Sequence, residues 1–319
     1  MATITSPATF AQLQPDVGFD YVYAEQAIRM EIAEELDVLG LGLVQLWAEL
    51  QGTGSDVARV TRMGGVGWQE AMVELAGETD PIVKTGFRTG FDTVAIARHG
   101  LAKSESYQSA LLSREPAVLL QALKELLPQS WLKTLRSKWA TVGASFADSV
   151  GTPGTAWTFT DELALVAYFH ETEGFPGMAI TGRHPEQFTD LRTSIRAEPN
   201  FQFPEITQQI QGLRAGGGSF DFLGLRNFAS FDVTDSGGDH QGFAYVPGAI
   251  GWAVVRTDEL RMEVEDPDKA LFVEDFGLVC EWKSDGETAS AEFNANAWFG
   301  TGKADPSVAP QVRIVSIND

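Results

Sequence analysis

Apolar residues fall at helical spacing in the first part of the chain, between residues 21 and 50. Their separations of three and four positions are those of one face of a helix. The positions are Ile28, Ile32, Leu36, Leu39 and Leu43. Gly40 and Gly42 interrupt this run, so we expect two helical pieces after an extended N-terminal segment over residues 1–19.

A second and longer helical stretch is expected over residues 104–146. Ser104 is placed to cap its start. Pro116 suits the first turn of a second piece, where its missing N–H costs nothing. Pro128 falls inside the stretch and predicts a kink or a restart of the helix. The apolar stripe consists of Val118, Leu119, Ala122, Leu123, Leu126, Trp131, Leu132, Leu135 and Trp139.

Residues 55–100 have the pattern of strands joined by glycine-rich turns. We expect strands over residues 57–62, 70–76 and 91–97. The intervening glycines are Gly64, Gly65, Gly67, Gly77, Gly86 and Gly90. The segment has too little apolar content for a core of its own, so it predicts a β-hairpin arm that needs another surface to lie on.

The remaining sequence mixes short helices and strands, which predicts an α+β fold. After a turn at residues 151–154, Thr160 is expected to cap a helix over residues 161–169. Two further helices are expected, one carrying Leu191 and Ile195 and one over residues 203–213. Strands are expected over residues 178–181, 220–225, 228–233, 243–246, 249–255, 260–265, 278–282, 289–299 and 311–317.

Composition and charge narrow the classes of function. The chain has 319 residues, of which 44% are hydrophobic, and this is ample for a buried core. Its formal net charge of −21 repels nucleic acid, which argues against a DNA- or RNA-binding enzyme. It does not exclude a container that holds DNA without binding it tightly. No signal peptide and no run of roughly 18 apolar residues is found, so we expect a protein that is neither secreted nor membrane-spanning.

No motif assigns a catalytic, cofactor-binding or metal-binding residue. The four histidines, at positions 99, 170, 184 and 240, do not stand at metal-ligand spacing. Cys280 is the single cysteine and is expected to be a buried thiol. Neither a serine-nucleophile elbow nor a Walker loop occurs. Two acidic loops fit either a stray cation or a solvated face; they contain Asp232, Asp235, Asp239, Glu263, Glu265, Asp266 and Asp268.

Basic residues gather in the expected hairpin region although the whole chain is acidic. They are Arg59, Arg62, Lys84, Arg88 and Arg98. One interpretation is that a basic arm pairs with the acidic body of a neighbouring copy and sets the register between them. The other is that these are ordinary solvated charges. We take the five residues as candidates for contacts between subunits.

The order of these parts resembles the HK97-like capsid fold of tailed bacteriophages. Residues 112–146, with Glu115-Pro116, Trp131 and Gly143-Ala144-Ser145-Phe146, are similar to the spine region of phage coat proteins. Residues 242–250 look like the exit from the A-domain of that fold.

The resemblance divides the chain into five parts. They are an N-terminal arm with helices (1–54), an extended β-hairpin or E-loop (55–100), the spine helix region of the P-domain (101–148), an A-domain (149–255) and returning P-domain strands (256–319).

The function implied by the resemblance is structural and not enzymatic, with no cofactor. Copies would self-assemble in the host cytoplasm into hexamers and pentamers of an icosahedral virion shell around the phage genome. A separate scaffolding protein, a portal and a cement protein are the implied partners, and the DNA is enclosed without sequence-specific binding. Two alternatives are an encapsulin-like compartment shell and an acidic α+β hydrolase, which would need a perturbed carboxylate pair in a deep pocket.

Overall fold

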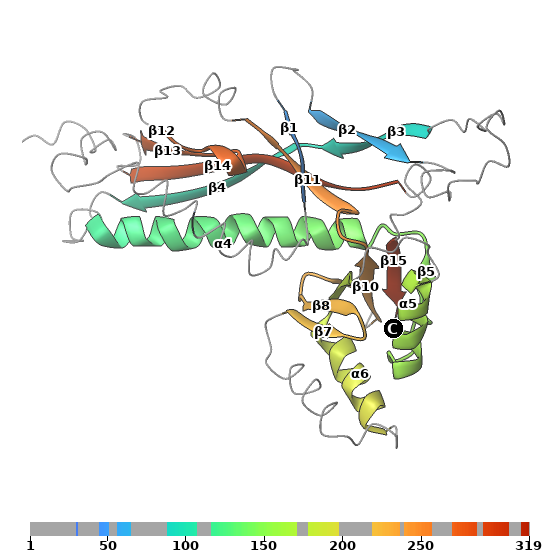
Figure 1. Ribbon diagram of the computed structural model, residues 1–319. Coiled ribbons are helices and arrows are strands. Elements are labelled where there is room, and N and C mark those ends of the chain that lie inside the picture. The colour runs from blue at the N-terminus through green and yellow to red at the C-terminus, as the bar shows by residue number, and fades with distance from the viewer. Residues whose placement is uncertain are drawn as a thin grey trace, which may run out of the picture.

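Two β-sheets are joined by one long helix that contacts both of them (Figure 1). The computed structural model describes residues 30, 45–50, 56–64, 88–106, 116–170, 178–197, 219–236, 239–256, 270–285, 290–305 and 314–318. Four expected elements lie outside these residues, namely the N-terminal segment 1–19, the strands 70–76 and 260–265, and the helix 203–213.

Helix α4, Pro116–Gly143, is a single helix with Pro128 inside it. Its first residue confirms the predicted start at Pro116. The expected start at Ser104 is wrong, because residues 97–106 form a strand. The helix also does not restart at Pro128, one of the two outcomes expected there, because it continues to Gly143. Proline has no N–H, so the helix lacks one backbone hydrogen bond at Pro128. Packing on both sides of it compensates, since Leu127 and Trp131 are each only 3% exposed.

The first sheet runs in the order β1-β11-β14-β13-β12, and β4 also pairs with β14. Its strands are β1 (Gln45–Leu50), β4 (Ala97–Ser106), β11 (Ile250–Val255), β12 (Ala270–Val273), β13 (Leu278–Asp285) and β14 (Ser290–Lys303), with the short 3-10 helix η3 (Glu274–Phe276) after β12. The helix expected over residues 21–50 is wrong at its end, because β1 pairs in parallel with β11. That partner lies far along the chain, where local periodicity carries no information about it.

The second sheet runs in the order β5-β15-β10-β6-β8-β7, with β9 paired to β10. Its strands are β5 (Ser149–Val150), β6 (Ala179–Arg183), β7 (Ser219–Phe222), β8 (Leu225–Ala229), β9 (Thr234–Ser236), β10 (Asp239–Tyr245) and β15 (Ile314–Asn318). Helices α5 (Phe159–His170) and α6 (Pro185–Ala197) pack on one face of this sheet. The last strand, β15, pairs with β10 and β5.

Most other expected elements are confirmed, with three local corrections. Helix α5 is capped by Thr158 rather than Thr160, since Thr158 and Asp161 exchange hydrogen bonds in a capping box. The strand expected over residues 220–225 is divided by a turn at Leu223 and Gly224, whose φ angles are 52° and 79°. The strand expected over residues 228–233 is only the end of β8, which stops at Ala229.

One buried stripe of side chains on helix α4 packs against both sheets. Trp131 packs edge-on against Trp252 and Phe276 of the first sheet, with ring centroids 5.5 and 5.2 Å away. Two turns later, Trp139 packs against Phe243 of the second sheet at 4.6 Å. Its indole N–H also donates a hydrogen bond of 2.8 Å to the hydroxyl of Tyr245. The helix therefore fixes how the two sheets sit relative to one another.

A fully buried ion pair lies between α5 and the second sheet. Arg183 Nη1 of β6 lies 2.7 Å from Glu162 Oε2 of α5, and both side chains are 0% exposed. Trp157 donates a further hydrogen bond to the same carboxylate oxygen and stacks beside the guanidinium. Each charge is compensated mainly by the other, because water does not reach either group.

The arm consists of β2 (Val57–Gly64) and β3 (Arg88–Ala95), paired antiparallel over their full lengths. Its base crosses β14 at two glycines. A Cβ atom on Gly300 would collide with the carbonyl oxygen of Ala95, and one on Gly302 would lie 2.8 Å from Cγ2 of Val94. The glycines thus let the backbone of β3 lie directly on β14.

We expect Glu162→Gln to lower the free energy of unfolding by about 3–5 kcal/mol, because it leaves the Arg183 charge buried and uncompensated. Urea unfolding of the unassembled chain measures this. Asp221→Asn is the matched control, since it breaks the exposed Arg226–Asp221 pair and should cost under about 1 kcal/mol. Equal losses in the two variants would contradict the role given to the buried pair.

We expect Gly300→Ala to destabilise the chain by about 1–3 kcal/mol, the usual cost of forcing an extra methyl group into a packed contact. Gly100→Ala is the control, since a Cβ there would lie 3.4 Å from Asn296 Oδ1, an ordinary contact. Thermal unfolding of both variants checks the prediction. An unchanged midpoint for Gly300→Ala would show that β3 does not depend on this close approach.

Candidate assembly surface on the β2–β3 hairpin

The two faces of the hairpin differ in burial because side chains alternate along each strand. Ala58 and Val94 are directly paired and nearly fully buried, and they belong to a small apolar cluster with Leu50 and Ala253. On the other face, Arg59, Thr61, Phe91 and Thr93 are exposed. One face of the ribbon is therefore attached to the body at its base, and the other is open to solvent.

Arg59 and Phe91 form a contact on the exposed face. The guanidinium carbon lies 5.1 Å from the centre of the Phe91 ring, within cation–π range. Phe91 is 57% exposed although it is a large apolar side chain. Arginine and aromatic residues are the types that dominate binding energy at protein interfaces. This pair gives the arm a surface suited to a partner.

The structure places three of the five candidate basic residues on this ribbon. Arg59 lies opposite Thr93, Arg62 opposite Gly90, and Arg88 opposite Gly64. The side chains of Arg62 and Arg88 are outside the described part of the chain, as is the whole of Lys84.

Arg98 lies elsewhere, on β4 of the first sheet. It donates a hydrogen bond of 3.1 Å to Asn296 Oδ1 and lies over the ring of Trp298. Its guanidinium is thus engaged within its own sheet rather than presented on the arm.

Among the described residues, neither the hollow on the first sheet nor the single cysteine has the groups that hydrolysis or thiol catalysis requires. A hollow of about 280 Å³ on the first sheet is lined by Arg98 and Asn296 among others, and Glu281 is the one carboxylate in that lining. Hydrolysis by paired carboxylates needs two. Cys280 is confirmed as a buried thiol, and burial raises its pKa, so it is not a thiolate nucleophile at neutral pH.

His99 of β4 also has a shifted pKa. Burial lowers it below 6.5, and the nearby charge of Lys138 lowers it further. The ring packs on Phe299 with centroids 4.6 Å apart. The neutral imidazole is therefore favoured, as is typical of a packed side chain between helix and sheet.

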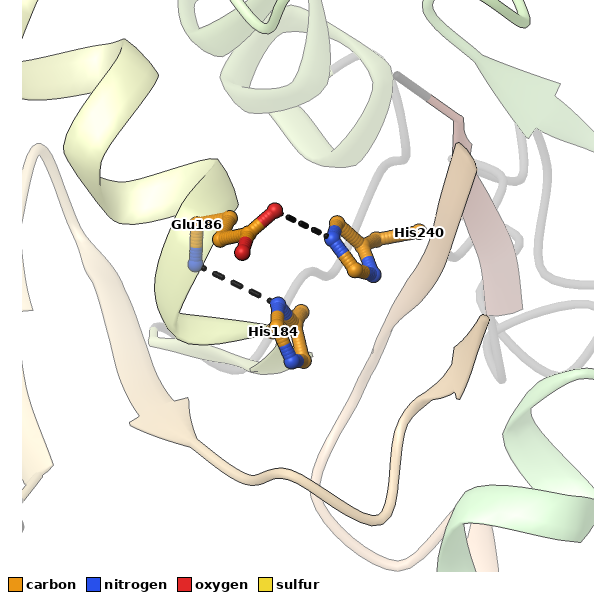
Figure 2. Close-up of side chains that lie close together, drawn as sticks. All are labelled: His184, Glu186 and His240. Carbon is orange, nitrogen blue, oxygen red and sulfur yellow. Dashed lines mark hydrogen bonds and ion pairs between the residues drawn. The ribbon is translucent and has the colours of Figure 1, made fainter. Parts of the chain in front are cut away.

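The structure brings together two histidines that the sequence treated as unrelated. His184 and His240 stack beside Glu186 at the start of α6 (Figure 2). The spacing of His184 and Glu186 before a helix was visible in the sequence. Their partner on β10 was not, because only the pairing of β10 with β6 brings it there.

Comparisons of sequence alone find no relative. No protein-family model and no curated protein matches this chain. None of the described helices is long and apolar enough to cross a membrane.

Comparisons of structure find bacteriophage capsids. The capsid of cyanophage Pam1 matches with a TM-score of 0.53 at 11% identity, covering 86% of this chain and 88% of that one. The acid-stable capsid of Helicobacter pylori bacteriophage KHP30 matches with a TM-score of 0.53 at 11% identity, covering 87% of each chain. A chain from Mycobacterium phage Che8 matches with a TM-score of 0.52 at 14% identity, covering 86% of this chain and 89% of its own. Two sheets, a long helix that packs against both and a projecting hairpin thus make up the HK97-like fold of tailed-bacteriophage capsid proteins, and the chain has that fold.

Proposed function

We propose that this chain is the major capsid protein of a tailed bacteriophage, a structural protein without a catalytic role. The observation that carries the proposal is the arm formed by β2 and β3 (Figure 1). Among the described residues, its buried contacts with the body are at its base, around Ala58 and Val94. A two-stranded ribbon is marginally stable in water by itself, so its exposed face calls for a further surface. A neighbouring copy of the chain supplies that surface.

The charge of the molecule supports contact between copies. The chain has a net charge of −21, whereas the arm presents Arg59 beside an exposed aromatic ring. A basic arm laid across an acidic neighbour gains attraction and a defined orientation. Repeated around a closed symmetric ring, many modest contacts of this kind give a stable shell. We therefore assign hexamers and pentamers of an icosahedral virion shell as the assembled form.

We propose the following division of the chain for this role. We propose residues 1–54 as the N-terminal arm, 55–100 as the E-loop, 101–148 as the spine region, 149–255 as the A-domain and 256–319 as the returning P-domain. The strands support moving the end of the A-domain back to the turn after Tyr245, because β11 already belongs to the first sheet.

The acidity of the chain also fits a wall that encloses DNA without binding its sequence, since like charges keep the wall and its contents apart. We propose assembly in the host cytoplasm with a separate scaffolding protein, a portal and a cement protein. Electron microscopy of the expressed full chain, alone and with its genomic neighbours, tests the function. Uniform shells or rings of five or six copies support it, and a discrete monomer or dimer under both conditions contradicts it. Shells that form without a scaffolding partner and enclose a protein cargo would favour the encapsulin-like alternative.

We expect Phe91→Ser to raise the concentration needed for assembly by about tenfold or more, because losing roughly 1.4 kcal/mol at each arm contact changes an equilibrium tenfold. Folding should be unaffected, since Phe91 is already exposed in the single chain. Sedimentation velocity over a concentration series measures assembly, and thermal unfolding of the unassembled chain measures folding.

The matched control for this prediction is Leu163→Ser, which removes another exposed apolar side chain, on α5. It should leave the assembly concentration within about twofold, as surface substitutions away from a contact usually do. Equal effects of the two variants would remove the special role of the hairpin. A normal assembly concentration for Phe91→Ser would do the same.

A further inference from the structure

Three side chains with metal-ligand chemistry converge where α6 begins. His184 and Glu186 stand at the start of the helix, and His240 reaches them from β10 (Figure 2). Their ligand atoms all lie within 4.8 Å of one another. His240 Nε2 is 2.8 Å from Glu186 Oε2, and the two imidazole rings stack with centroids 3.7 Å apart. Residues far apart in sequence thus bring two imidazole nitrogens and one carboxylate close together.

A buried amide holds the two histidines in place. Gln187 is fully buried, and its side-chain Nε2 donates a hydrogen bond of 2.8 Å to the carbonyl of His240. The backbone N–H of His184 donates a hydrogen bond of 3.1 Å to Oε1 of the same side chain. Gly242 makes room for this amide, because a Cβ there would lie 2.8 Å from Gln187 Oε1. The backbone at both histidines is thus held in place, which is part of the support that a metal site requires.

We propose that His184, Glu186 and His240 bind a divalent transition-metal ion of the Zn²⁺ class. Two imidazoles with one carboxylate are a zinc ligand set that leaves a coordination position for water. Imidazole ligands favour zinc, nickel, cobalt or copper over magnesium and calcium, which prefer oxygen. The metal would join the start of α6 to β10 in the second sheet.

Closing the site on an ion requires the ring of His184 to turn, because two nearly parallel stacked rings cannot both point at one ion. Metal–ligand distances of roughly 2.0–2.2 Å place ligand atoms within about 4 Å of each other, so an inward shift is needed as well. Glu186 can make it, because its side chain is 72% exposed. Nδ1 of His184 now accepts a hydrogen bond from the Glu186 backbone at 3.3 Å, a long bond whose loss costs little. The exposed carboxylate also gives an ion a path from solvent.

Zinc binding to the full chain tests the proposal. After dialysis against a chelator, isothermal titration calorimetry with zinc chloride should show saturable binding of one ion per chain. Magnesium at a large excess should not compete. Cobalt(II) substituted at the site should give visible absorption bands typical of nitrogen and oxygen ligands. No saturable zinc binding by the wild-type chain would overturn the proposal.

Substitutions of the proposed ligands test where the ion binds. His184→Ala and Glu186→Gln should each weaken zinc binding by about tenfold or more, since losing a ligand costs at least as much as losing an outer-shell partner. Both positions are partly or largely exposed, so these variants keep the fold where His240→Ala, at a buried position, puts it at risk. His170→Ala is the control, as an exposed histidine on α5 outside the cluster. Binding that is unchanged in His184→Ala and Glu186→Gln, or lost equally in His170→Ala, would assign the zinc to the acidic surface and overturn the site.

Discussion

The contact that the rest of the structure depends on is the buried stripe of helix α4. Trp131 enters an aromatic cluster of the first sheet, and Trp139 enters one of the second. The two residues are eight positions apart, or about 12 Å along a helix axis, so a single rigid element sets the spacing of the sheets. Without this shared helix, each sheet would have its own small core and no fixed orientation toward the other.

Close backbone approaches make this arrangement possible. Phe243 occupies space that a side chain at Gly143 or Gly182 would fill, so the end of α4 can lie directly on β6 and β10. Glycines also allow a close contact at the base of the arm, where Gly300 and Gly302 let β3 lie on β14. Such close contacts, with aromatic rings at Gly143 and Gly182 and with β3 at Gly300 and Gly302, leave little freedom at these crossings. As a result, the hairpin leaves the first sheet in a fixed direction, and the histidine cluster sits at a fixed place in the second.

The sequence predicted those elements whose signal is local. The period of α4 and its start at Pro116 needed only neighbouring residues, as did the strands β2, β13 and β14. It failed where distant partners decide the outcome. Gln45–Leu50 becomes a strand because β11 pairs with it, and Pro128 is accepted because both of its flanks are buried. The candidate sites divide in the same way. Arginines on the hairpin were found from a local cluster, whereas the ring of His240 reaches Glu186 only through strand pairing.

The acidity of the chain limits where copies can meet. Charges on separate copies act on each other only within about 8–10 Å at moderate salt, so the local charge at a contact matters more than the total of −21. Along the described ribbon, the side chain of Arg59 is exposed on one face, whereas Asp92 on the other face is only 3% exposed and Asp56 lies at the base. The exposed contact of Arg59 with Phe91 is therefore a point of positive charge on an acidic molecule. A contact of that sign is what attraction between like-charged copies requires, and in this fold it lies on the hairpin, whose buried contacts among the described residues are at its base.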